Sequence, residues 1–194
     1  MILMRGNRWG PEGPPEDAYS RVTEPERFAP LHDFAAELLD RLEATYDVES
    51  EAGLGLDPYL ESVGTPARPT RRLVPRSPIA APMAVGFTAF PGLVVRFGRW
   101  QVAPFPNCGC DACDETFETE SDHLERLVEG VTTGRFTETM RLPRGSGEGW
   151  LGARYEYAGG SEGGEGVISR SEANRLLAGD PPGTITWQPW PRRG

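Results

Sequence analysis

Apolar residues recur every three or four positions in three stretches of the chain, which is the spacing of one face of an α-helix. The first stretch predicts a helix over residues 30–46. A capping box at Thr23–Glu26 predicts one turn before it. Because Pro30 has no amide hydrogen to continue the helical bonding, we expect a kink between that turn and the main helix.

Two further helices are predicted in the second half of the chain. Thr119 or Ser121 can cap a helix that ends near Gly134, and its acidic first turn suits the positive end of the helix dipole. A second capping box, Ser169–Glu172, opens a short helix that stops before Gly179. The expected total is therefore about three helices.

Apolar and polar positions alternate over residues 83–102, which predicts strands with one buried face. Turn residues at Pro91–Gly92 and Gly98–Arg99 divide this stretch, so we expect an antiparallel hairpin or meander. Weaker alternation predicts three more strands, the last at the edge of the sheet: 136–142, 150–157 and 184–190.

Prolines recur throughout residues 49–82, and we expect a long connection there without a helix. It carries a run of arginines that is expected to lie against acidic groups of the same molecule, in preference to forming an anion site: Arg68, Arg71, Arg72 and Arg76. The glycines of residues 159–166 predict a flexible loop.

These elements predict an α+β fold, an antiparallel sheet packed by about three helices with long Pro- and Gly-rich loops. The 194 residues fit a single domain over residues 23–194, and the Gly- and Pro-rich residues 1–22 predict an extended or mobile arm. Only 38% of the residues are hydrophobic, so we expect a core of modest size.

The formal net charge is −9, which disfavours nucleic acid and favours a basic protein as partner. No window approaches the length of a membrane span, and the start of the chain lacks the apolar run of a signal peptide. We therefore expect a cytoplasmic protein that does not meet a membrane. Neither its oligomeric state nor its pathway follows from the sequence.

All three cysteines of the chain lie within the segment FPNCGCDACDE, residues 105–115. The first interpretation of this cluster is a zinc site, because Cys110 and Cys113 have the two-residue spacing of a zinc knuckle and Cys108 can add a third thiolate. His123 is the nearest nitrogen in the sequence and the first candidate for the fourth ligand, with His32 and the local carboxylates as the other options. The cofactor expected at this site is zinc.

Two other interpretations stay open. Cysteines that pack as small hydrophobic residues in a tight loop need no metal. Redox chemistry through Cys110 and Cys113 is the third, although carboxylates such as Asp111 would raise the pKa of nearby thiols and so disfavour it. The pair His123 and Glu125 matches half of a zinc deaminase signature, but the cysteines precede the histidine, which is the wrong order.

Three segments together resemble an uncharacterised actinobacterial family, a domain of unknown function: residues 19–48, the run RFGRW followed by FPNCGCDACDE, and the late SRSEANRLLAG. CGCDACDE is the most specific of these motifs. The resemblance covers most of the chain from Tyr19 to Trp190 and implies a one-domain protein. It implies no activity, cofactor or catalytic residue.

We therefore expect a non-catalytic binding or interaction module with a structural, zinc-binding cysteine loop. The alternative is a metal-dependent or thiol-based enzyme that uses the same cysteines. A catalytic site would need a concave pocket with converging polar groups beside the cysteines, whereas a structural site would be closed and shallow.

Overall fold

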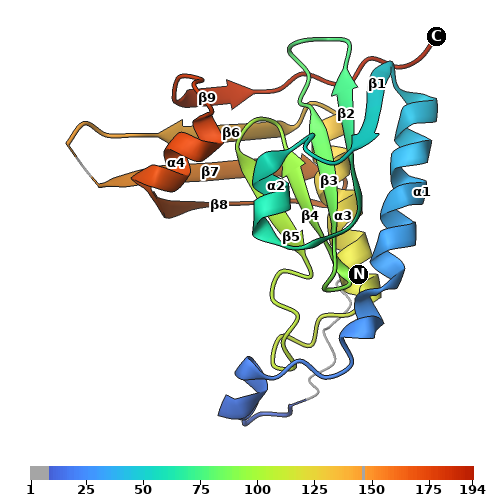
Figure 1. The fold of residues 1–194 in the computed structure, drawn as a ribbon, viewed down its shortest axis with the longest axis vertical. Helices are drawn as coiled ribbons and strands as arrows, with labels where there is room; N and C mark the ends of the chain where they lie inside the picture. Colours follow the sequence, from blue (N-terminus) through green and yellow to red (C-terminus); the bar gives the residue numbers. More distant parts are fainter. Residues whose placement is uncertain (1–8, 146) are drawn as a thin grey trace.

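The computed structural model describes residues 9–145 and 147–194 and has an α+β fold with two antiparallel sheets (Figure 1). The first sheet has the strand order β1-β2-β3-β4-β5 and the second the order β8-β7-β6-β9. The first sheet is formed by β1 (Val48–Gly53), β2 (Pro66–Pro75), β3 (Met83–Thr88), β4 (Gly92–Phe97) and β5 (Gln101–Phe105). The second is formed by β6 (Phe136–Arg141), β7 (Glu148–Tyr157), β8 (Gly160–Ser169) and β9 (Gly183–Thr186).

The described residues form four α-helices beside these sheets: α1 (Pro30–Thr45), α2 (Pro58–Val63), α3 (Phe117–Thr132) and α4 (Arg170–Leu177). Two short 3-10 helices, Glu16–Ser20 and Pro25–Phe28, precede α1. The predicted fold class, the helices that became α1, α3 and α4, and the hairpin strands β3 to β5 are confirmed. The fold differs from the prediction in having two sheets and a fourth helix.

Alternation along the strands decides which helix covers each face of the first sheet. Val85 of β3 and Val95 of β4 belong to the main core, which they share with the apolar faces of α1 and α3. Ala84 and Val94 point the other way and pack against Leu60 of α2. The first sheet is thus enclosed between α1 and α3 on one face and α2 on the other (Figure 1).

The proline-rich connection was predicted wrongly, because residues 49–82 contain α2 and most of two paired strands. Pro58 is tolerated because it opens α2, where its missing amide has no helical partner to lose, and the Asp57 carboxylate caps the next amides. The arginines of β2 do lie against acidic groups of the same chain: Arg71 bonds to Asp40 of α1 at 2.7 Å.

The glycine-rich loop prediction was also wrong, since residues 160–169 form β8 and pair with the whole of β7. The close approach of the two strands explains the composition. A Cβ atom at Gly163 would collide with the carbonyl oxygen of Ala153, so the register needs glycine at that position.

Two of the predicted helix caps differ from those in the structure. Thr23 caps no helix, because its hydroxyl donates to Asp111 at 2.7 Å. The cap of α3 is Thr116, whose hydroxyl accepts from the amide of Thr119 at 3.3 Å in a reciprocal capping box. Ser169 caps α4 as predicted.

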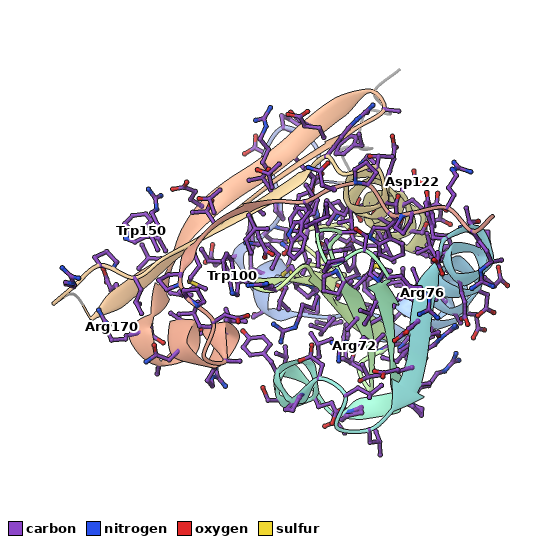
Figure 2. All side chains as sticks on the ribbon, turned by 90° about the horizontal axis from the view of Figure 1, so that it is seen from above. Arg72, Arg76, Trp100, Asp122, Trp150 and Arg170 are labelled. Carbon is purple, nitrogen blue, oxygen red and sulfur yellow. The ribbon has the colours of Figure 1, made fainter. Side chains whose placement is uncertain are left out.

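The two sheets meet at the turn between β4 and β5. Trp100 of this turn is fully buried and packs against Met140 of β6 and Leu177 of α4, and it lies at the junction of the two sheets in Figure 2. On the outer part of the second sheet, Trp150 is partly exposed.

One buried carboxylate fastens this junction. Glu138 of β6 is fully buried and accepts the amide hydrogens of Arg99 and Trp100 at 2.8 and 2.9 Å. It also accepts from the amide of Gln101 at 3.3 Å and from the indole nitrogen of Trp187 at 2.9 Å. Burial raises the pKa of Glu138, while these four donors oppose the rise.

Among the described residues, no helix has the length and apolar composition that a membrane crossing requires.

Candidate metal centre

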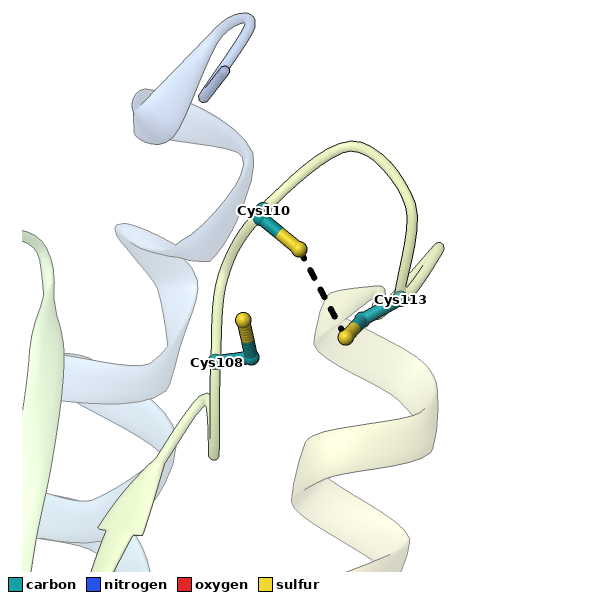
Figure 3. Close-up of side chains that lie close together, drawn as sticks. All are labelled: Cys108, Cys110 and Cys113. Atoms are coloured by element: carbon teal, nitrogen blue, oxygen red, sulfur yellow. Dashed lines mark hydrogen bonds between the residues drawn. The ribbon is translucent and has the colours of Figure 1, made fainter. Parts of the chain in front are cut away.

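The three cysteines lie on the loop between β5 and α3, at the bottom of the view in Figure 1. Their side chains point toward one another (Figure 3), and the three sulfur atoms all lie within 4.8 Å of one another. The sulfurs of Cys110 and Cys113 are 3.5 Å apart and all three thiols are free. Cys110 is buried, Cys113 is half-buried and Cys108 is exposed.

Left-handed backbone conformations on either side of the cysteine pair bend the loop into this shape. Gly109 has a φ of 77° and Asp114 a φ of 52°. At Gly109 a Cβ atom would also come within 3.1 Å of the Phe90 ring and 3.2 Å of Pro106. Glycine is therefore needed there for both its backbone and its size.

The acidic residues of the motif hold the loop together. The Glu115 carboxylate accepts the amides of Cys108 and Gly109 at 3.2 and 2.6 Å. Asp111 accepts the Thr23 amide at 2.7 Å and the Thr23 hydroxyl at 2.7 Å. These carboxylate oxygens are occupied by donors, so they stabilise the loop and do not point at the sulfurs.

The segment before α1 closes the loop from outside. The amides of Asp111 and Ala112 donate to the carbonyls of Arg21 and Ala18 at 2.9 and 3.2 Å. The Arg21 guanidinium binds the Asp111 carboxylate at 2.9 Å. Arg27 donates to the carbonyl of Gly109 at 3.0 Å. Two segments far apart in the sequence therefore form one unit around the cysteines.

The hydrogen bonds around Asp111 hold the pKa of its carboxyl well below the usual range. The Thr23 hydroxyl is the largest cause, followed by the Thr23 amide and by Arg21. Folding therefore favours the carboxylate form of this side chain.

The three thiols have different environments. A hydrogen bond from Cys108 lowers the pKa of Cys110, and the backbone amides of Cys113 and Ala112 act in the same direction. Burial raises the pKa of Cys113 to about 12. The carboxylates were expected to raise the pKa of the thiols, and for Cys110 this was wrong because hydrogen bonds, the largest from Cys108, lower its pKa.

His123 lies on α3 and was predicted as the fourth ligand. Its Nε2 atom is bonded to Glu162 of β8 at 2.7 Å, and its ring packs against Phe105 with the centroids 5.3 Å apart. Within the described parts of the chain, the group of ligand atoms around the sulfurs contains the three cysteines and does not include His123.

A cavity of about 480 Å³ opens beside Cys108. It is lined by the ends of β3, β4 and β5 and by the end of α2 with the two residues that follow it, and most of its lining residues are apolar or glycine. Cys108 is the one cysteine among its described lining residues, which include no acidic, basic or histidine side chain.

The sequence predicted the cysteine cluster but not the hydrogen bonds that hold its loop in place. The residues that form them are Arg21, Thr23, Arg27, Asp111 and Glu115. The partners of Arg21, Thr23 and Arg27 lie 82 to 90 residues away in the chain, so no local spacing connects them. The one available signal was Asp111 and Glu115 within the motif, which are typical of residues that bind backbone amides in tight turns.

The chain belongs to the family described as "Family of unknown function (DUF6226)", which matches residues 4–194. Neither the comparison with curated proteins nor the comparison with solved structures gave a match.

Proposed function

We propose that this member of DUF6226 is a non-catalytic module in which Cys108, Cys110 and Cys113 bind a zinc ion as a structural staple. The observation that carries the proposal is the approach of three free thiols to within 4.8 Å. Thiolate sulfur is a preferred ligand of Zn²⁺ with a bond of about 2.3 Å, so two sulfurs on one tetrahedral ion lie about 3.8 Å apart. The 3.5 Å between Cys110 and Cys113 fits this separation.

The surroundings support a structural role. The loop already bonds to the segment before α1 through Asp111 and Arg27, so a metal there would fix both segments at once. The same influences that lower the pKa of Cys110 would stabilise its thiolate toward the ion. Zinc sites of this kind contribute directly to folding free energy.

The alternative, an enzyme that uses the same cysteines, has less support. A catalytic site needs acid, base or charge-stabilising groups that converge on the reacting atoms. Within the part of the chain that the structure describes, the cavity beside Cys108 offers no second group of this kind. The exposed Cys108 leaves room for water as the fourth donor, and His123 would first have to leave Glu162 to serve as one.

The decisive experiment is metal analysis of the full chain purified without a metal-binding tag. We expect about one zinc per chain, and we expect Cys110→Ser with Cys113→Ser to lose both the metal and thermal stability. Ser121→Ala is the matched control, because it removes a hydroxyl from α3, the helix that follows the loop, without touching a thiol. A protein that holds no metal, whose melting temperature does not rise with added zinc, would contradict the proposal.

Two further parts of the proposal rest on composition. We propose a basic protein as the partner, because the chain carries a net charge of −9. We also propose a cytoplasmic location, which the three free thiols support. If the partner is basic, its association rate with this chain should fall steeply as salt is added.

A further inference from the structure

A second cavity, of about 540 Å³, lies between the two sheets and shares no lining residue with the cysteine loop. Its walls come from α2, from β3 and β4 of the first sheet, and from α4 on the second sheet. Four arginines and two aspartates line it: Arg72, Arg96, Arg99, Arg175, Asp57 and Asp180. An excess of positive charge in a cavity of a chain with net charge −9 requires an explanation.

Strand register creates the floor of this cavity. Arg72 of β2 is paired with Ala84 of β3, and Ala84 is paired in turn with Arg96 of β4. Directly paired residues point to the same face of a sheet. The small Ala84 therefore leaves a depression between two long cationic side chains.

Tyr59 of α2 and Arg175 of α4 form the wall above this floor. The Arg175 guanidinium lies 5.4 Å from the centre of the Tyr59 ring, and the Arg96 guanidinium lies 5.2 Å from it. The Tyr59 hydroxyl donates to Glu172 at 2.7 Å, which fixes the ring between the two helices. Burial raises the pKa of Tyr59 to about 12, so the ring stays neutral and adds no negative charge.

The arginines differ in how fully they are already paired. Arg96 is bound to both oxygens of Asp57, with one contact at 2.8 Å, so its role is structural. Among the described residues, Arg72 has one distant carboxylate, Glu51 at 3.9 Å, and Arg99 has Asp180 at 3.5 Å. Arg175 forms no ion pair with any residue that the structure describes. Three guanidinium groups therefore keep donors for a ligand.

We propose that this cavity binds a small polyanion through Arg72, Arg99 and Arg175. Guanidinium groups present paired N–H donors that match the oxygens of phosphate and carboxylate. Tyr59 and the apolar side chains of Leu56 and Leu176 line the same cavity and give an organic ligand a surface for its uncharged part. The ligand class is a small molecule with two or more oxyanion groups.

The site also connects the two halves of the fold. Arg72 belongs to the first sheet, whereas Arg175 lies on α4 against the second. A polyanion that bridges them would bind the folded chain and not the unfolded one, so it should raise the melting temperature.

The test is isothermal titration of the full chain with pyrophosphate and, separately, with citrate at constant ionic strength. We expect saturable binding of one of the two, which also decides between phosphate and carboxylate. Arg72→Gln with Arg175→Gln should weaken that binding at least about tenfold. Both side chains are partly or fully exposed, so the variant should fold, and its melting curve checks this.

Arg41→Gln with Arg154→Gln is the matched control, since it removes the same charge from exposed ion pairs elsewhere on the surface. This control should bind within twofold of the wild type. Equal weakening in both double variants would assign the effect to overall charge and overturn the site. Failure of both polyanions to bind at millimolar concentration would overturn it as well, whatever the metal analysis of the cysteine loop shows.

Discussion

The cysteine loop and the junction of the two sheets both depend on carboxylates that accept several hydrogen bonds, and Asp111 can be compared with Glu138. Asp111 is buried, and it binds the half-exposed guanidinium of Arg21 together with two donors of Thr23. Glu138 is fully buried and receives four N–H donors, none of them charged. The pKa of Asp111 is lowered and that of Glu138 is raised.

The difference shows what sets the cost of a carboxylate in a joint. Hydrogen bonds favour the charged form at both sites and burial opposes it at both, but burial prevails only at Glu138. Asp111 binds the half-exposed guanidinium of Arg21, a charged donor, whereas the donors of Glu138 are uncharged. Glu138 holds the core joint, where its removal would leave donors buried without an acceptor.

The largest effect is expected at the core joint. Glu138→Ala leaves the amides of Arg99 and Trp100 and the indole of Trp187 without their acceptor, and should lower the free energy of unfolding by about 3–5 kcal/mol. Chemical denaturation measures it. Glu138→Gln keeps one acceptor oxygen and should cost less, and equal costs for the two variants would show that the hydrogen bonds are not what matters.

Gly98→Ala probes the same joint from the opposite side. Gly98 has a φ of 64°, and a Cβ atom there would collide with the Glu138 carboxylate. The backbone strain alone costs about 1–2 kcal/mol, and displacement of the carboxylate adds to it. Gly145→Ala, at a φ of 76° with open space around it, is the control that carries strain without the collision. Equal destabilisation by both would argue against a tight joint.

A smaller effect is expected at the cysteine loop. Asp111→Asn keeps the shape of the side chain but loses the charge that binds Arg21. The segment Glu16–Arg21 should loosen, so the amides of Asp111 and Ala112, which bond to it, should exchange hydrogen faster. Asp122→Asn, an exposed change on α3, should leave that exchange as it is. Unchanged exchange in Asp111→Asn would show that the charge of the carboxylate is not needed to hold the segment on the loop.

Because the pKa of Asp111 is lowered and that of Glu138 is raised, the two groups should change the stability of the fold with pH in opposite directions. The unfolded chain binds more protons at Asp111 than the folded one, so this group adds stability above about pH 4 that is lost as the pH falls below it. At Glu138 the folded chain binds more protons, so stability falls as the pH rises from about 4 through the raised pKa. Denaturation from pH 3 to 7 measures the free energy of unfolding. This free energy should depend less on pH on the acid side in Asp111→Asn, and less on pH above pH 4 in Glu138→Gln.

The smallest effect is expected at a third carboxylate, Glu162, which binds His123 in a half-exposed pair. His123→Ala should cost less than about 1 kcal/mol and should leave the zinc content of the chain unchanged, because Nε2 is already bonded away from the sulfurs. Loss of zinc in this variant would instead make His123 the fourth ligand.

The helices and the hairpin could be predicted because one amphipathic face is visible in the local sequence. Leu38 and Leu42 of α1 and the alternating Val85 and Phe87 of β3 are buried as that spacing requires. The cysteine cluster was equally local, with all three sulfurs on one loop.

The rest could not be predicted because its cause lies far away in the chain. β8 is a strand because β7 supplies a complete ladder, and its glycines gave no apolar signal. Thr23 does not form its expected helix cap. Its amide and hydroxyl donate instead to the Asp111 carboxylate, 88 residues away. The cavity between the sheets likewise depends on a register that places Arg72 and Arg96 on either side of Ala84.

The docking of the first segment onto the cysteine loop also has a consequence for synthesis on the ribosome. Thr23 leaves the ribosome before its partner Asp111, which follows 88 residues later. At about 5–20 residues per second, the segment waits roughly 5–20 s for its binding site. The order of translation therefore delays this contact until the loop has been made, and the unpaired segment is available to chaperones until then.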